Sequence, residues 1–106
     1  MKRNLTALSE CEEQIMCVIW DYESPPDLHA VLVEANRRYY RDWQSQTIST
    51  FLARIREKGY VTSYKVGRYT YYSPVVGKEM YREEKTRKIL DGLYGGRREL
   101  MIQDIM

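Results

Sequence analysis

Four short polar side chains in the middle of the chain are suited to reading a partner surface through hydrogen bonds. They are Gln46, Thr47, Ser49 and Thr50. A glutamine amide can pair bidentately with adenine, and a threonine methyl group can contact the methyl group of thymine. Side chains of these types favour contact with base edges in the major groove of DNA, provided that one element presents them together.

An amphipathic helix over residues 45–58 is the element predicted to present them. Apolar residues recur there at i, i+3, i+4 and i+7, so they share one buried stripe. This stripe consists of Ile48, Phe51, Leu52 and Ile55. The polar side chains then lie on the opposite face, with Thr47 at its margin. Ser45 is the expected N-cap, and Gly59 is the expected residue that stops the helix.

A basic hairpin is predicted directly after this helix. Residues 60–66 and 69–73 are rich in Tyr, Val and Thr, which is typical of strands. Gly67 supplies the turn, and Pro74 ends the second strand. A polar-faced helix followed by a basic hairpin indicates the winged-helix variant of the helix-turn-helix.

Further helices are expected on both sides of this unit. Ser9 and Glu12 have the spacing of a capping box, which starts a helix over residues 10–22. Asp27 is the expected N-cap of a helix over residues 28–39. Residues 80–94 are predicted as a helix that a Gly-Gly pair at 95–96 breaks. The apolar cluster over residues 100–106 indicates a surface for a partner.

The charge distribution is strongly asymmetric, although the net charge is only +2. Residues 8–34 contain seven acids and no Lys or Arg, whereas residues 37–72 contain eight bases and two acids. A basic half that coincides with the polar-faced helix and the hairpin favours a polyanionic partner. The candidates for contact with DNA phosphates are Arg54, Lys58, Lys65, Arg68, Tyr69 and Tyr71.

Some of these candidates have structural alternatives. Lys58 could equally interact with the dipole at the C-terminal end of its helix. Arg37, Arg38 and Arg41 either steer DNA from the side or form a solvated helix end. For Tyr72, packing beneath the wing is the favoured reading over contact with phosphate.

Other function classes lack their signatures. We find no nucleophile with a base partner, no Walker-type phosphate loop and no Cys/His cluster, so we expect no enzymatic activity, no cofactor and no metal. His29, the only histidine, is interpreted as a solvated helix residue. No apolar run reaches the length of a membrane helix, so we expect a cytoplasmic protein without direct membrane insertion.

Motifs along nearly the whole chain, taken in order, resemble the penicillinase and methicillin-resistance repressor family, the BlaI/MecI/CopY group. The matching residues are Leu5-Thr6, Glu12, Ile15-Met16, Ile19-Trp20, Trp43, Thr47-Ile48, Thr50, Leu52, Arg54, Lys58-Gly59, Gly67-Arg68, Tyr72-x-Pro74 and Leu93-Tyr94-x-Gly96. Each motif is weak alone, but their combined spacing is fairly specific.

The resemblance implies an α+β fold, with a winged helix-turn-helix DNA-binding domain at residues 1–76 and a short C-terminal helical dimerisation arm at residues 77–106. It implies a homodimeric repressor that binds double-stranded operator DNA, with base contacts at Gln46, Thr47, Ser49 and Thr50. We expect the pseudo-palindromic operator of a two-fold dimer. The residues expected in the dimer contact are Leu90, Leu93, Tyr94, Leu100, Met101, Ile102 and Ile105. In the antibiotic branch, a membrane sensor-protease system leads to cleavage within the arm, which makes such a system an expected upstream partner.

Three features depart from the family pattern. The sequence stops at Met106, where the family continues into a further dimerisation helix. Either the sequence is truncated or the lineage has a reduced arm. The cleavage position falls near Asp104-Ile105 instead of an Asn-Phe pair, so proteolytic induction is not carried over. The cysteine-rich metal motif of the copper-responsive branch is absent, which excludes copper sensing by that route.

The alternative function is a winged-helix protein-interaction module without specific DNA binding. The tyrosine-rich wing would then hold another protein, and weak, salt-insensitive DNA binding would favour this reading. An RNA-binding winged helix is a further alternative, which competition between DNA and RNA would test.

Overall fold

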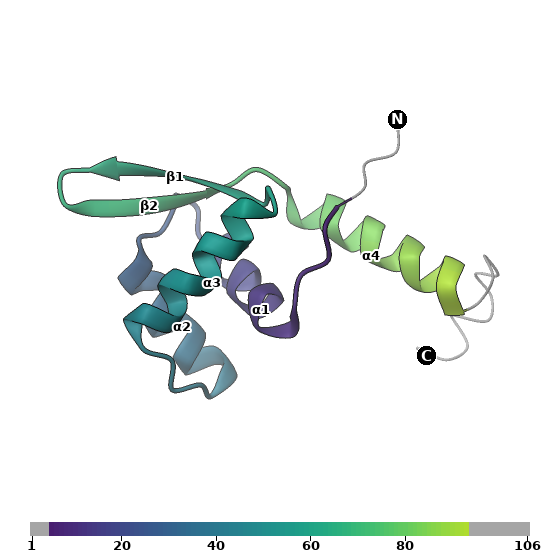
Figure 1. The fold of residues 1–106 in the computed structure, drawn as a ribbon, viewed down its shortest axis with the longest axis horizontal. Coiled ribbons are helices and arrows are strands. Elements are labelled where there is room, and N and C mark those ends of the chain that lie inside the picture. The colour runs from purple at the N-terminus through teal and green to yellow at the C-terminus, as the bar shows by residue number, and fades with distance from the viewer. Residues whose placement is uncertain (1–4, 94–106) are drawn as a thin grey trace. The chain divides into compact units, whose positions relative to one another are not determined.

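The structure is a computed structural model of the 106-residue chain, and it describes residues 5–93. The elements follow one another as α1 (Glu10–Trp20), α2 (Leu28–Tyr39), α3 (Ser45–Glu57), β1 (Val61–Val66), β2 (Tyr69–Pro74) and α4 (Lys78–Leu93) (Figure 1). Residues 6–77 form one compact unit, and Leu5 with residues 78–93 belong to a second. The predicted α+β winged-helix architecture is confirmed.

The first helix begins as its sequence predicts. Ser9 Oγ accepts a hydrogen bond from the Glu12 amide at 3.2 Å, and the Ser9 amide donates to Glu12 Oε1 at 2.8 Å. The predicted end at Tyr22 is wrong, because α1 stops at Trp20. Backbone bonds of the tighter i to i+3 type close the helix, and Tyr22 is left 40% exposed.

α2 and α3 form the helix pair that the sequence indicates. The carboxylate of Asp27 caps α2 by accepting from the Ala30 amide at 2.8 Å. α3, however, begins after Gln44, so the prediction of Ser45 as N-cap is wrong. The reason is that the side chain of Asn36 on α2 fixes the approach to α3, with two hydrogen bonds of 2.9 Å to the backbone of Trp43. A side-chain cap is therefore not needed to set the start of α3.

The core of the larger unit lies where α1, α2 and α3 meet. Its central apolar side chains are almost fully buried, with exposed fractions of 1% or less. They are Ile15, Met16, Ile19, Val31, Ala35, Ile48, Leu52 and Ile55. Each of these three helices contacts the other two, and β2 contacts α1 and α2. Because α3 buries its apolar stripe against this core, its opposite side is held at the surface.

The wing is an antiparallel hairpin in which Val66 pairs with Tyr69 and Val61 pairs with Pro74. The intervening Gly67 has φ 63°, a left-handed conformation that glycine adopts without steric cost. The segment before α2 lies along the other edge of β2, because the Tyr72 amide donates to the Pro26 carbonyl at 2.9 Å. This contact fixes the start of α2 beside the wing.

α4 begins two residues earlier than predicted, and Tyr94, its predicted last residue, lies outside the described residues. Ion pairs along the helix join Glu79 to Arg82, and Arg87 to Glu84 and Asp91. Within residues 5–93, no helix has the length and apolar character that crossing a membrane requires.

Candidate nucleic-acid interface

The polar face of α3 is uncovered. Gln46, Thr47, Ser49 and Thr50 are all exposed, whereas Ile48 between them is fully buried. The Thr50 hydroxyl donates to the Gln46 carbonyl at 3.0 Å, so its proton is already used within the helix. The other three side chains make no hydrogen bond to any residue in the range 5–93. Their donors and acceptors are free for a partner.

A cleft of about 380 Å³ adjoins this face. It lies between the start of α2, the middle of α3 and the tip of the wing. The lining residues are Asp27, Leu28, His29, Ser49, Arg68, Tyr69, Thr70 and Tyr72. Three of the sequence-predicted contact residues therefore come together here, from α3 and from the wing. The interface that results places a hydroxyl and a guanidinium group around one concave surface.

Three predicted phosphate-contacting cations are exposed. The guanidinium of Arg68 lies over the Tyr69 ring at 5.5 Å, which orients it without neutralising its charge. Arg54 and Lys65 have no hydrogen bond or ion pair with any described residue. Lys65 pairs with Thr70 across the hairpin, so the two lie on the same side of the wing. That side includes Thr70 of the cleft.

Lys58 is occupied by a structural role. Its ammonium group lies 2.6 Å from Glu12 Oε1 and 2.9 Å from the carbonyl of Ala7. Burial raises the pKa of the Glu12 carboxyl, but Lys58 and the Ser9 amide outweigh it, so that this pKa lies below the usual 4.5. From the sequence, Lys58 could either contact DNA phosphate or interact with the helix dipole. Neither of these alternatives includes the observed ion pair with Glu12 of α1.

The arginines at the end of α2 are engaged with acidic neighbours. Arg37 and Arg38 both bind Glu34, and Arg38 also donates to Asp21 at 2.7 Å. Mainly through the hydrogen bond from Arg37, against the effect of burial, the pKa of Glu34 falls to about 2. Arg41 donates to Gln14 and lies 5.0 Å from the Trp43 ring centre. The local charge of this helix end is therefore largely compensated.

The tyrosines of the wing differ in exposure. Tyr72 is 8% exposed, which confirms that it packs beneath the wing, and burial raises the pKa of its phenol. Tyr71 stacks on Tyr64 of the paired strand with ring centres 5.6 Å apart. Tyr71 is not among the residues that line the cleft, whereas Tyr69 is.

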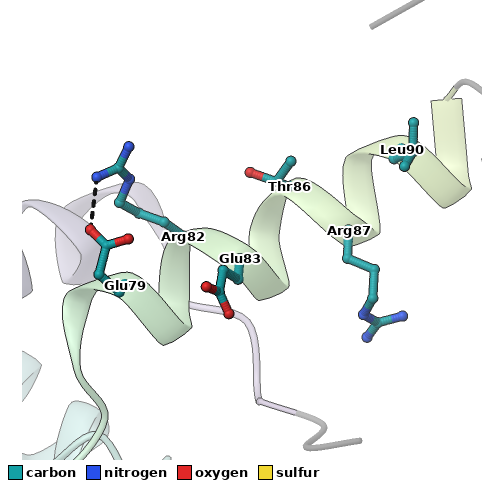
Figure 2. Close-up of a pocket in the computed structure, with 6 residues that line it drawn as sticks. All are labelled: Glu79, Arg82, Glu83, Thr86, Arg87 and Leu90. Atoms are coloured by element: carbon teal, nitrogen blue, oxygen red, sulfur yellow. Dashed lines mark hydrogen bonds and ion pairs between the residues drawn. The ribbon is translucent and has the colours of Figure 1, made fainter. Parts of the chain in front are cut away.

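The second unit supplies an open groove along α4, with a volume of about 360 Å³. The described residues that line it are Glu79, Arg82, Glu83, Thr86, Arg87 and Leu90. Figure 2 shows Arg82 reaching back to Glu79, while Arg87 points away from Thr86 and Leu90. Leu90, the one predicted dimer residue whose side chain is described, lines this groove and is half-buried. Of the other predicted dimer residues, Tyr94, Leu100, Met101, Ile102 and Ile105 lie outside the described residues.

The sequence does not predict that His29 lines the cleft. His29 is exposed, as expected of a solvated helix residue, but it lines the same cleft as Ser49 and Arg68. The pairing of Pro26 with Tyr72 brings it there, and only a long-range pattern could have indicated that pairing. Among residues 5–93, no three His, Cys, Asp or Glu residues are grouped so that they could hold a metal ion.

The helix order, the hairpin and the uncovered polar face of α3 define a winged-helix domain of the DNA-binding type. The family model described as penicillinase repressor matches residues 8–106, and the chain belongs to this family. The family comprises DNA-binding transcriptional repressors and not enzymes, which confirms the prediction of a non-enzymatic protein.

Individual relatives agree with this assignment. The penicillinase repressor of Bacillus licheniformis is 28% identical over 98% of this chain and 79% of its own length. The solution structure of the DNA-binding domain of the repressor BlaI superimposes with a TM-score of 0.62 at 29% identity, covering 76% of this chain and 94% of that domain. The monomeric form of Bacillus licheniformis BlaI in complex with the blaP half-operator gives a TM-score of 0.60 at 29% identity, covering 74% and 92%.

Proposed function

We propose that this chain is a sequence-specific DNA-binding transcriptional repressor that acts as a homodimer on a pseudo-palindromic operator. The observation that carries the proposal is the uncovered polar face of α3, whose Gln46, Thr47 and Ser49 side chains have no partner among the described residues. A helix that reads base edges in the major groove needs side-chain donors and acceptors that are free to bond with the bases. Arg68 lines the adjoining cleft, which supports a contact between its guanidinium group and the sugar–phosphate backbone beside that groove.

Base recognition is assigned to the start of α3. Gln46 would pair with adenine, Thr47 and Thr50 would contact thymine methyl groups, and Ser49 would hydrogen-bond a base or a phosphate at the cleft. Thr50 is suited to the apolar contact, because its hydroxyl proton is already donated to the Gln46 carbonyl. The proposal therefore assigns the greatest single share of base discrimination to Gln46.

Affinity is assigned mainly to phosphate contacts, which release counterions and make binding strongly salt-dependent. Arg54, Lys65, Arg68 and Tyr69 are the proposed contributors, because each is exposed. Lys58 and Tyr71 take a smaller part than the sequence indicates, because one is paired with Glu12 and the other stacks on Tyr64.

Dimerisation is assigned to the helical region after the winged helix, with Leu90 and the apolar residues beyond it. A two-fold dimer presents two identical α3 helices to successive major grooves, so the operator should contain two similar half-sites. The relative that was solved as a monomer with a half-operator supports the half-site as the unit bound by one subunit. Sedimentation with duplexes that carry one or two half-sites tests this. Equal affinity for both duplexes would reject the dimer model.

A second candidate, a winged-helix protein-interaction module, is favoured by one observation. Tyr64, Val66 and Tyr69 of the wing are 45%, 58% and 47% exposed, which is high for large apolar side chains. Binding of a protein partner through this surface would leave DNA affinity weak and nearly independent of salt. A steep salt dependence of DNA binding would reject this candidate as the main function.

The proposal also places the protein in the cytoplasm, with a membrane sensor-protease system as the upstream partner. Both rest on the family to which the chain belongs. Cell fractionation tests the location. Release of repression after the inducing signal, in cells with and without the sensor, tests the partner.

A further inference from the structure

His29 is the only histidine of the chain, and it opens onto the cleft beside the recognition helix. It belongs to the first turn of α2, whereas Ser49 comes from α3 and Arg68 from the tip of the wing. Three separate elements therefore bring an imidazole, a hydroxyl and a guanidinium group to one concave surface. The base-reading function assigned to α3 does not use the imidazole.

The charges around the cleft nearly cancel while the imidazole is neutral. Asp27 contributes one carboxylate, which is held by the Ala30 amide at 2.8 Å, and Arg68 contributes one guanidinium. Tyr69 and Tyr72 are the other titratable side chains on the lining. Protonation of His29 would change the formal charge of the lining from zero to +1.

We propose that this cleft binds one phosphate group of the DNA backbone, and that protonated His29 holds it together with Arg68. This inference rests on the proposed DNA-binding function and assigns a new contact residue and a coupling to it. A phosphate oxygen accepts charge-assisted hydrogen bonds from both cations, while Ser49 donates its hydroxyl proton. DNA binding then takes up a proton at His29 whenever the free protein carries the neutral imidazole.

The sign of the pH dependence follows from this coupling. Because phosphate binding favours the protonated imidazole, affinity is highest at low pH and falls as the pH rises through the range where histidine loses its proton. Hydrogen bonds to charged groups are among the stronger ones. We expect affinity per subunit to fall about tenfold between about pH 5.8 and about pH 7.5.

Fluorescence anisotropy with a labelled duplex of random sequence provides the test, because a phosphate contact does not depend on base sequence. The wild-type protein should bind more tightly at the lower pH. The affinity of His29→Gln should not change with pH and should equal the weaker wild-type affinity at the higher pH. The affinity of His29→Lys should also not change with pH, but it should equal the tighter wild-type affinity at the lower pH. Arg82→Gln, a loss of charge on α4 outside the cleft, should keep the wild-type profile.

Two results would overturn the inference: a flat profile for the wild-type protein, or an unchanged profile in His29→Gln. Because there is no other histidine, a wild-type profile that persists in His29→Gln would have to arise elsewhere. A wild-type protein that binds no duplex at any pH would instead overturn the proposed function itself. Thermal unfolding at both pH values confirms that the variants are folded, as expected for an exposed position.

Proton resonances of the His29 ring distinguish DNA from free phosphate as the source of the anion. Titration with duplex DNA should move the ring signals toward those of the protonated form at constant pH. Titration with inorganic phosphate at the same concentration of phosphate groups should move them little, because a lone ion lacks the contacts with α3 and the wing. An equal response to inorganic phosphate would overturn the assignment to the DNA backbone.

Discussion

The ammonium group of Lys58 lies 2.6 Å from the carboxylate of Glu12 and joins the end of α3 to the first turn of α1. The side chain of Glu12 is only 3% exposed, and its Oε1 also accepts from the Ser9 amide. One carboxylate therefore closes the capping box of α1 and anchors α3, the helix proposed to read bases. Lys58, which the sequence predicts as a phosphate contact, instead holds α3 against α1.

Replacement of Lys58 by Met should destabilise the protein, because it leaves the buried Glu12 carboxylate without its cation. We expect a loss of about 2 kcal/mol in the free energy of unfolding, below the full cost of breaking a buried pair because Lys58 is partly exposed. Glu12→Gln should cost less, because the Lys58 ammonium can then turn to water. Urea unfolding measures both values, and a Lys58→Met protein as stable as wild type would refute the structural role.

Acid should weaken the same pair. The pKa of Glu12 is lowered in the folded protein, so the contribution of the carboxylate is present above about pH 4.5 and is lost as the pH falls through the folded-state pKa. The gap in unfolding free energy between wild type and Glu12→Gln should therefore shrink as the pH falls below about 4.5. Urea unfolding of both proteins across this range checks it. A gap that is constant or that widens would contradict the lowered pKa.

Replacement of Tyr40 by glycine should make the folded protein more stable. It has φ 54° and ψ 43° at the end of α2, a left-handed conformation that costs a residue with a Cβ about 1 kcal/mol. Its side chain is 95% exposed, so little packing is lost. After the greater freedom of glycine in the unfolded chain is allowed for, Tyr40→Gly should gain about 0.5 kcal/mol. Tyr40→Ala is the matched control and should gain nothing, because it keeps the Cβ. A gain of equal size in both would show that the ring matters and the backbone does not.

Arg68 should contribute one phosphate contact per subunit. Arg68→Ala should therefore reduce the magnitude of the log–log salt slope of DNA binding by about 0.9 per subunit and weaken binding to all sequences alike. Arg82→Ala serves as a control at an exposed arginine of α4. Anisotropy over a range of salt concentrations measures the slopes. Equal slopes for wild type and Arg68→Ala would remove the wing tip from the phosphate contacts.

Local patterns predict most of this fold because they depend on residues close in sequence. The capping box of Ser9 and Glu12 and the apolar stripe of α3 are properties of single helices, and each is found where its spacing indicates. The glycine at 67 likewise fixes the hairpin turn by itself. The exposed polar face of α3 follows from the stripe, since burying one side of a helix exposes the other.

The features that the sequence does not reveal depend on pairs that are far apart. Glu12 and Lys58 are separated by 46 positions, and no local rule couples them. The bond from the Tyr72 amide to Pro26 and the bridge between Asp27 and Tyr71 draw the start of α2 to the wing, which brings His29 to the cleft. The prediction of Ser45 as the N-cap of α3 is wrong for a similar reason, because Asn36 from the preceding helix fixes the backbone at Trp43.

Selection from a pool of random-sequence duplexes tests whether the exposed face of α3 reads base sequence. The wild-type protein should enrich a two-fold symmetric sequence with two half-sites. Gln46→Ala should enrich the same sequence with the preference lost at one position in each half-site, a discrimination of about 1–3 kcal/mol. No enriched sequence for the wild type, or identical preferences for both proteins at every position, would show that this face does not read base sequence.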